Sequence, residues 1–102
     1  MKNHADVIII GGGIIGCAAA YYIRKKGYSV IVLEGSPHIG NGGSSRNGGG
    51  VRQSGRDPRE LPLAMYAIKH LWPALSDELE VDCEYHQDGN LRLGKTQKHL
   101  EI

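Results

Sequence analysis

The sequence contains no phenylalanine, and aromatic residues make up only 6% of its 102 residues. It has two cysteines, Cys17 and Cys83, and neither lies in a C-x-x-C pair or at a spacing typical of metal sites. These absences exclude a disulfide-rich scaffold and a four-cysteine zinc site. A single disulfide remains an alternative, but two free thiols in a reducing compartment are the simpler interpretation, and we predict a cytoplasmic location.

Long apolar runs and an excess of charge of one sign are also missing. No stretch approaches the ~20 apolar residues of a membrane span, and the N-terminus lacks the features of a signal peptide. The formal net charge is +1, from 12 Lys and Arg against 11 Asp and Glu, so the overall charge does not attract nucleic acid or membranes. The five histidines show no metal-ligand spacing. We therefore expect no metal site, no nucleic-acid partner and no membrane span.

Glycine, in contrast, is abundant: the chain has 15, and most of them gather in two clusters. The first cluster lies inside a pattern typical of a strand–helix–strand unit. Residues 5–10 and 29–33 are apolar runs typical of buried parallel strands, and residues 14–26 between them have helical periodicity. Gly27 suits the end of that helix. The sequence therefore predicts an α/β fold that opens with a right-handed, Rossmann-like βαβ unit.

The first cluster has the spacing G-x-G-x-x-G, formed by Gly11, Gly13 and Gly16 between strand and helix. Gly11 permits a tight turn, Gly13 lets a pyrophosphate approach the backbone, and Gly16 lets the helix pack closely on the strand. Glu34 ends the second strand, where a carboxylate can accept ribose hydroxyls and repel a 2′-phosphate. Cys17 is expected to pack on the sheet. The pattern predicts a dinucleotide site that disfavours NADP; the alternative is a tight turn without a ligand.

The second cluster follows Glu34 directly, in the segment "GSPHIGNGGSSRNGGGVRQ" at residues 35–53. Ser44 and Ser45 supply hydroxyl groups, and Arg46 offers a planar fork that can neutralise a phosphate. The glycines at 48–50 allow backbone to lie against a flat ring. A disordered linker is the alternative interpretation. Because a well-capped helix follows, we interpret the segment as the second half of a cofactor cradle.

Three further elements are predicted after this segment. Asp57 suits the N-cap of a helix, and Pro73 is expected to kink or restart that helix. The pair Asp88 and Gly89 lies between two short alternating runs and predicts a β-hairpin within residues 83–94. Thr96 suits the N-cap of another helix. The predicted fold is thus a partial Rossmann-like unit followed by helices and a hairpin.

Taken together, the glycine fingerprint, Glu34 and the stretches "GGSSRNGGGVRQ" and "DPRELPLAMYAIKHLWPAL" resemble a known family. They are similar to the N-terminus of FAD-dependent D-amino-acid oxidase-like enzymes, especially the branch of sarcosine oxidase β-subunit, glycine oxidase and proline dehydrogenase. The resemblance covers nearly the whole chain. It implies FAD as cofactor and hydride transfer to the flavin from a small amine such as glycine, sarcosine, proline or a D-amino acid. It identifies no catalytic residue here.

Carried over by position, the resemblance places the FAD pyrophosphate at the three glycines of the fingerprint and the adenosine ribose at Glu34. Residues 44–47 would line the diphosphate and ribityl chain, and residues 48–51 the flavin ring. Arg52 and Gln53 would be neighbours of the ring or the substrate. The implied cofactor contacts are Gly11, Gly13, Ile14, Ile15, Gly16, Glu34, Gly35, Ser44, Ser45, Arg46, Asn47, Gly48, Gly49, Gly50 and Val51.

Enzymes of this family are much longer and carry a separate substrate domain. The resemblance therefore implies that residues 1–102 are the N-terminal portion of an FAD-binding domain, truncated or completed by another subunit and inactive alone. With few strands and open sheet edges, we expect marginal stability or oligomerisation. Two alternatives remain open: a fragment of an NAD-dependent dehydrogenase, and a non-catalytic interaction module.

Overall fold

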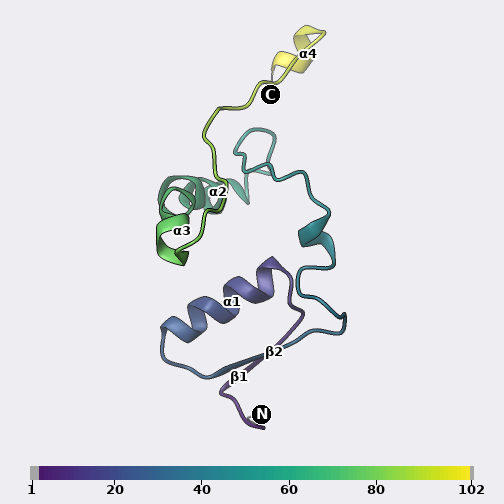
Figure 1. Ribbon diagram of the computed structural model, residues 1–102. Coiled ribbons are helices and arrows are strands. Elements are labelled where there is room, and N and C mark those ends of the chain that lie inside the picture. The colour runs from purple at the N-terminus through teal and green to yellow at the C-terminus, as the bar shows by residue number, and fades with distance from the viewer. Residues whose placement is uncertain (1–2, 102) are drawn as a thin grey trace. The chain divides into compact units, whose positions relative to one another are not determined.

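The structure, a computed structural model, describes residues 3–101. The chain falls into two compact units, Met1–Gly49 and Gly50–Ile102. The first unit contains both strands and the helix between them, and the second contains the remaining helices (Figure 1). The boundary lies inside the second glycine cluster, at Gly49, whose φ is +68°.

The first unit has the predicted βαβ topology. Strand β1 (Val7–Ile10) is followed by α1 (Ile14–Lys25) and by β2 (Val30–Leu33), which pairs with β1 in parallel. Helix α1 contacts both strands. Gly27 follows its C-cap, and the Gly27 N–H donates to the Arg24 carbonyl (2.9 Å), while its φ of +93° favours glycine. A short 3₁₀ turn, η1 (Gly43–Ser45), completes the unit.

The two strands are less buried than their sequences predict. Ile8 is 59% exposed and Ile10 is 88% exposed, and no hydrophobic side chain of residues 3–99 is fully buried. A parallel strand is buried on both sides only when layers cover both faces of its sheet. In the first unit α1 is the only helix longer than a single turn, so it can cover only one face. The prediction of buried strands was therefore wrong in this respect.

The second unit is a run of helices. It comprises α2 (Leu61–Tyr66), the π-helical turn η2 (Ala67–Leu71), α3 (Trp72–Leu79) and the short α4 (Gln97–Leu100), which has Thr96 at its N-cap position as predicted. Pro73 occupies the first turn of α3, and the wider turn η2 precedes it. The predicted restart at Pro73 is confirmed, since a wide turn accommodates a residue that has no N–H to donate.

The helix start predicted with Asp57 as N-cap was wrong by three residues, because the N-cap of α2 is Glu60. Asp57 does cap a turn: its Oδ1 accepts the Arg59 N–H (2.8 Å), and its carbonyl accepts the N–H of Leu61 (3.2 Å). However, Pro62 has no N–H, so the carbonyl of Pro58 receives no helical hydrogen bond. The turn is thereby separated from α2.

The predicted hairpin is also absent, because residues 82–94 contain no strand. Gly89 has the positive φ (+87°) that a tight turn uses, but Glu84 at φ +52° interrupts the extended run before it. Tyr85 stacks on Trp72, with ring centroids 5.5 Å apart, rather than on a cross-strand partner. An isolated hairpin is only marginally stable, and this contact with the helix replaces it.

Candidate functional site

The junction of β1 and α1 requires glycine at two positions, Gly11 in the turn and Gly16 in the first turns of α1. Gly11 has φ +104°, and its N–H donates to the Leu33 carbonyl (2.7 Å), which places the turn at the end of the sheet. A Cβ on Gly16 would lie 2.0 Å from the Gly11 carbonyl oxygen. No side chain fits there, so helix and turn are in the close contact that the fingerprint predicts.

Glu34 is tied to this turn by a short hydrogen bond. Its Oε2 accepts the Gly12 N–H (2.7 Å), and its Oε1 accepts both the N–H and the hydroxyl of Ser36 (2.9 Å each). The Ser36 N–H, then the Gly12 N–H and then the Ser36 hydroxyl hold the pKa of Glu34 below its ordinary value. The carboxylate is therefore ionised at neutral pH and fixed at the edge of the glycine turn.

The second glycine-rich segment folds back on the first. The Gly40 N–H donates to the Gly12 carbonyl (2.8 Å), and Ser44 Oγ accepts the N–H of Ile14 (2.8 Å), the first residue of α1. A Cβ on Gly13 would lie 3.1 Å from Ser44 Oγ. Residues 40–47 therefore form a strap over the turn, and within the first unit they are not a free linker.

The strap and the turn enclose an open pocket of about 480 Å³ at the start of α1. The first N–H groups of a helix have no partner within the helix, and the helix dipole makes this end attractive to anions. A phosphate group suits such a position. The residues that line the pocket are Gly12, Gly13, Ile14, Cys17, Ile39, Gly40, Ser44 and Asn47.

Several of the predicted contacts lie at this pocket, and others do not. Ile14 lines it, whereas the side chain of Ile15 is 84% exposed. Arg46 ends the turn η1 and is exposed, and no partner is recorded for its guanidinium among the described residues. The glycines at 48–50 and Val51 straddle the boundary between the two units. The structure therefore brings four of the predicted residues, Gly13, Ile14, Ser44 and Asn47, to one pocket, while the contacts of all the predicted residues with FAD stay predictions.

Four residues of the pocket were not among the predicted cofactor contacts: Gly12, Cys17, Ile39 and Gly40. Gly12 is the one fully buried residue among those described, and its N–H and carbonyl join Glu34 to the strap. Ile39 would touch a Cβ placed on Gly12 (3.1 Å from Cγ2). Cys17, expected to pack on the sheet, is half-buried and lines the pocket, with Sγ 3.5 Å from the Gly12 carbonyl. The unbroken run of three glycines was the available signal for Gly12.

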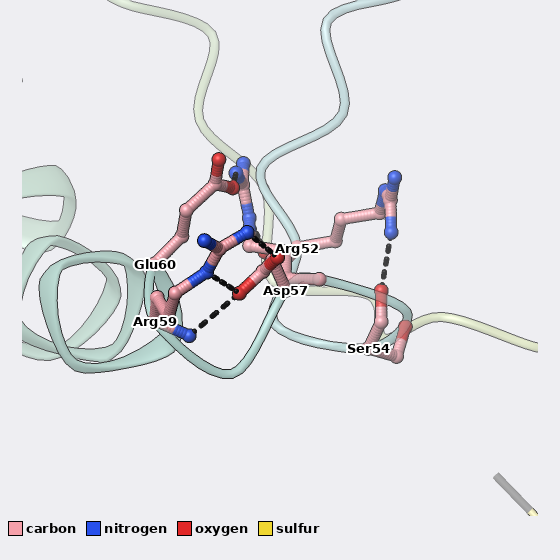
Figure 2. A network of polar contacts seen from close by, with 6 residues as sticks. Arg52, Ser54, Asp57, Arg59 and Glu60 are labelled. Carbon is pink, nitrogen blue, oxygen red and sulfur yellow. Dashed lines mark hydrogen bonds and ion pairs between the residues drawn. The ribbon is translucent and has the colours of Figure 1, made fainter.

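The second unit has a polar network of its own, which Figure 2 shows around the turn before α2. Arg59 lies against Asp57, with Nη2 2.7 Å from Oδ2, and Arg52 Nη1 donates to the Ser54 carbonyl. Arg59 lowers the pKa of Asp57. Nearby, a Cβ on Gly55 would lie 2.8 Å from Nη1 of Arg92. Arg52 and Arg92 line a polar pocket of about 330 Å³ in this unit.

Neither unit shows a metal centre or a membrane helix in residues 3–101. No three His, Cys, Asp or Glu side chains of these residues are grouped so that they could hold a metal ion. None of the helices in this range has the length and apolar character needed to cross a bilayer. Cys17 and Cys83 are both free thiols.

The geometry of the first unit agrees with the result of comparison with protein families. The family model described as "FAD dependent oxidoreductase" matches residues 6–102. The chain belongs to this family. The cofactor of the FAD-dependent oxidoreductases is FAD, as the resemblance in the sequence predicted.

Known FAD-dependent oxidoreductases and related chains align with most of the sequence. Sarcosine oxidase subunit beta of Rhizobium meliloti is 34% identical over 90% of this chain, and glycine oxidase of Geobacillus kaustophilus is 29% identical over 99%. The mitochondrial pyruvate dehydrogenase phosphatase regulatory subunit of Mus musculus is 34% identical over 98%. The chain spans 22%, 28% and 11% of these proteins, respectively. The comparison with solved structures found no match.

Proposed function

We propose that residues 1–102 are the N-terminal portion of an FAD-binding domain and that the first unit holds the adenosine diphosphate half of FAD. The observation that carries this proposal is the contact between Gly16 and the Gly11 carbonyl, where a Cβ would lie at 2.0 Å. That contact keeps the first turn of α1 close to the glycine turn, beside the pocket that Gly13 and Ile14 line. The start of α1 suits a diphosphate, and a side chain on Gly16 would push the helix away from the turn that forms the pocket.

Glu34 is proposed to hold the ribose. A carboxylate oxygen has about two acceptor positions, and Oε2 uses one of them for the Gly12 N–H (2.7 Å). One ribose hydroxyl can therefore bind Oε2 while every present hydrogen bond is kept. Oε1 already accepts two donors from Ser36.

The diphosphate is proposed to lie in the 480 Å³ pocket. The N–H groups of Ile15 and Gly16 in the first turn of α1 can donate to it. The Ser44 hydroxyl accepts one hydrogen bond from Ile14 and still has its own proton to give. Ser45, Arg46 and residues 47–51 complete the proposed site on the side of the ribityl chain and flavin, and Arg52 and Gln53 are proposed neighbours of the ring or substrate.

The proposed reaction of the whole protein is oxidation of a carbon–nitrogen bond in a small amine, such as sarcosine, glycine, proline or a D-amino acid. FAD, when bound, supplies the hydride acceptor. Support comes from relatives whose names are sarcosine oxidase subunit beta and glycine oxidase. The first of these names also supports assembly with another subunit or with further copies. The two free thiols support a cytoplasmic location.

Titration with FAD tests the proposed function directly. Flavin fluorescence should be quenched on addition of the chain, and the variant Gly16→Ala should abolish that quenching. Gly42→Ala is the matched control, because a Cβ at Gly42 would meet nothing within 4 Å. Binding of NADH without uptake of flavin would instead support an NAD-dependent dehydrogenase.

A non-catalytic regulatory role is a second candidate. The similarity to the mouse protein named as a regulatory subunit favours it. In this case the βαβ unit would act as a scaffold for a partner chain. Specific association with another protein, together with no affinity for either FAD or NADH, would support this candidate over the enzymatic one.

A further inference from the structure

Asn47 lies at the pocket, but its side chain is already engaged by the strap itself. Its Nδ2 donates to the carbonyl of Ser44 (2.6 Å), and its Oδ1 accepts the N–H of Gly49 (2.8 Å). Both ends of the amide therefore bridge the backbone on either side of it. Both polar atoms of the Asn47 side chain are thus already hydrogen-bonded within the protein, unlike those of a residue that binds only a ligand.

Two atoms of Ser44 are held by hydrogen bonds, one on its side chain and one on its backbone. Ser44 Oγ accepts the Ile14 N–H (2.8 Å), and the Ser44 carbonyl is held by Asn47. The 3₁₀ turn η1 closes around the same residue through the bond from the Arg46 N–H to the Gly43 carbonyl (3.1 Å). A second backbone bond, from the Ser45 N–H to the Gly42 carbonyl (3.3 Å), also closes this turn, and the Asn47 amide is the side chain that holds the Ser44 carbonyl itself.

We propose that Asn47 is a positioning residue that acts through Ser44. Its amide fixes the turn η1 so that the Ser44 hydroxyl meets the first N–H of α1, and the pocket is assembled before a dinucleotide arrives. The effect on FAD rests on the proposed function, whereas the effect on the strap does not. Preorganisation of this kind strengthens binding, because ordering a flexible loop when the ligand binds would cost conformational entropy.

The first test needs no ligand and follows amide hydrogen exchange in the ligand-free chain. Ile14 donates to Ser44 alone, so Ser44→Ala and Asn47→Ala should each make its amide exchange about fivefold faster. The double variant should show no further increase. Ser44→Thr, which keeps the hydroxyl, should retain protection. The matched control Asn90→Ala removes an amide in the second unit, bonded there to Ser54, and should leave Ile14 unchanged.

The Gly11 amide, which donates to Leu33, reports whether the variants still fold. It should stay protected in every variant. Unchanged exchange of Ile14 in Asn47→Ala would overturn the proposal, and so would loss of protection at both Ile14 and Gly11, because Asn47 would then act on the whole unit.

A double-mutant cycle on the affinity for FAD is the second test. If Asn47 acts through Ser44, the loss in the double variant should equal the loss in Ser44→Ala, about fivefold, rather than the product of the two single losses. Asn47→Asp keeps Oδ1 but replaces the donor to Ser44 by a negative charge at the pocket, so its loss of affinity should be at least as large as that of Asn47→Ala. Independent, multiplying losses would show that Asn47 contacts the ligand directly and would overturn the proposal. Absence of FAD binding in the unaltered chain would refute the proposed function, while the exchange data would still decide the role of Asn47.

Discussion

At the scale of single residues, the glycines of this chain differ in what they permit. Gly16 has its missing Cβ directed at a backbone oxygen, and Gly11 has a backbone angle that other residues rarely adopt. Gly42 has neither restriction, since φ is −95° and the space beside it is open. The glycines of this chain therefore include positions where no other residue would fit and positions where another residue could replace them.

Replacing Gly16 by alanine should destabilise the first unit. The new methyl group would lie 2.0 Å from the Gly11 oxygen, so turn and helix must separate, at a cost of about 1–3 kcal/mol in the free energy of unfolding. Urea titration followed by circular dichroism measures this difference. Gly42→Ala should change the same quantity by less than about 0.5 kcal/mol. Equal effects of the two substitutions would contradict the geometry of the turn.

Acid should weaken the clamp between Asp6 and Ser29 at the start of the sheet. Asp6 Oδ2 accepts the hydroxyl (2.6 Å) and the N–H (2.7 Å) of Ser29, and these bonds lower the pKa of Asp6 from 3.8. A carboxyl whose pKa is lower in the folded state adds stability above its unfolded pKa. That contribution is lost as the pH falls through 3.8 towards the folded value. Glu34 contributes with the same sign, from an ordinary value of 4.5.

Melting temperature measured between about pH 6 and pH 3 tests this expectation. Asp6→Asn should flatten the decline on acidification, because the variant has no proton to bind at this position. The control Asp88→Asn changes an exposed carboxyl in the second unit. A decline as steep in Asp6→Asn as in the unaltered chain would show that the clamp does not contribute.

At the scale of elements, the helical run of the second unit is shaped by its prolines. Pro62 separates α2 from the turn capped by Asp57, and Pro73 follows the π-helical turn η2. The side chains on this run remain in contact across the irregular turn, as the rings of Tyr66 and His70 show with centroids 4.9 Å apart. The π-helical turn η2 thus accommodates Pro73, which has no N–H to donate, and the chain stays helical from α2 to α3.

Replacing Pro73 by alanine should convert η2 and α3 into regular α-helix. The new N–H can donate to the Lys69 carbonyl, and alanine is favoured over proline by up to about 3 kcal/mol inside a helix. The helical signal in circular dichroism and the resistance to urea should both rise. Pro62→Ala is the control with a smaller expected gain, because only a single turn precedes Pro62, whereas the helical segments α2 and η2 precede Pro73. No difference between the two variants would contradict the role given to Pro73.

At the scale of the whole molecule, the described residues lack a closed hydrophobic core. Large apolar side chains are exposed in both units, among them Ile10 at 88%, Leu63 at 77% and Leu93 at 87%. Burial of apolar side chains is the main favourable contribution to folding. Because so few apolar side chains are buried, the free energy gained from their burial in each unit exceeds the entropic cost of folding by only a small amount.

We therefore expect the isolated chain to melt over a broad temperature range or to associate with itself. Scanning calorimetry and sedimentation velocity measure these two properties. Addition of FAD should raise the melting temperature in proportion to the logarithm of its concentration, because the ligand binds the folded state. A sharp transition in a monomer, without any response to FAD, would contradict both the expected instability and the proposed site.

The parts of the fold that sequence could predict are those determined locally. The βαβ unit, its three glycines and the restart at Pro73 follow from short-range patterns of apolar, glycine and proline residues. Contacts between residues that are far apart in the chain could not be predicted from sequence. Nothing in the spacing of residues shows that Ser44 accepts a hydrogen bond from Ile14, thirty positions earlier. The hairpin was predicted wrongly for the same reason, because the turn at Gly89 depends on the local sequence, whereas the pairing of strands does not.

The contiguity of the first unit has a consequence for the order of events during protein synthesis. Every hydrogen bond that builds the pocket joins residues before position 50, including the latest one, from Gly49 to Asn47. A ribosome adds about 5–20 residues each second, and N-terminal units fold first. The pocket can therefore form while residues beyond the first unit are still being translated, and with FAD bound there as proposed, cofactor supply in the cell would influence folding at that early moment.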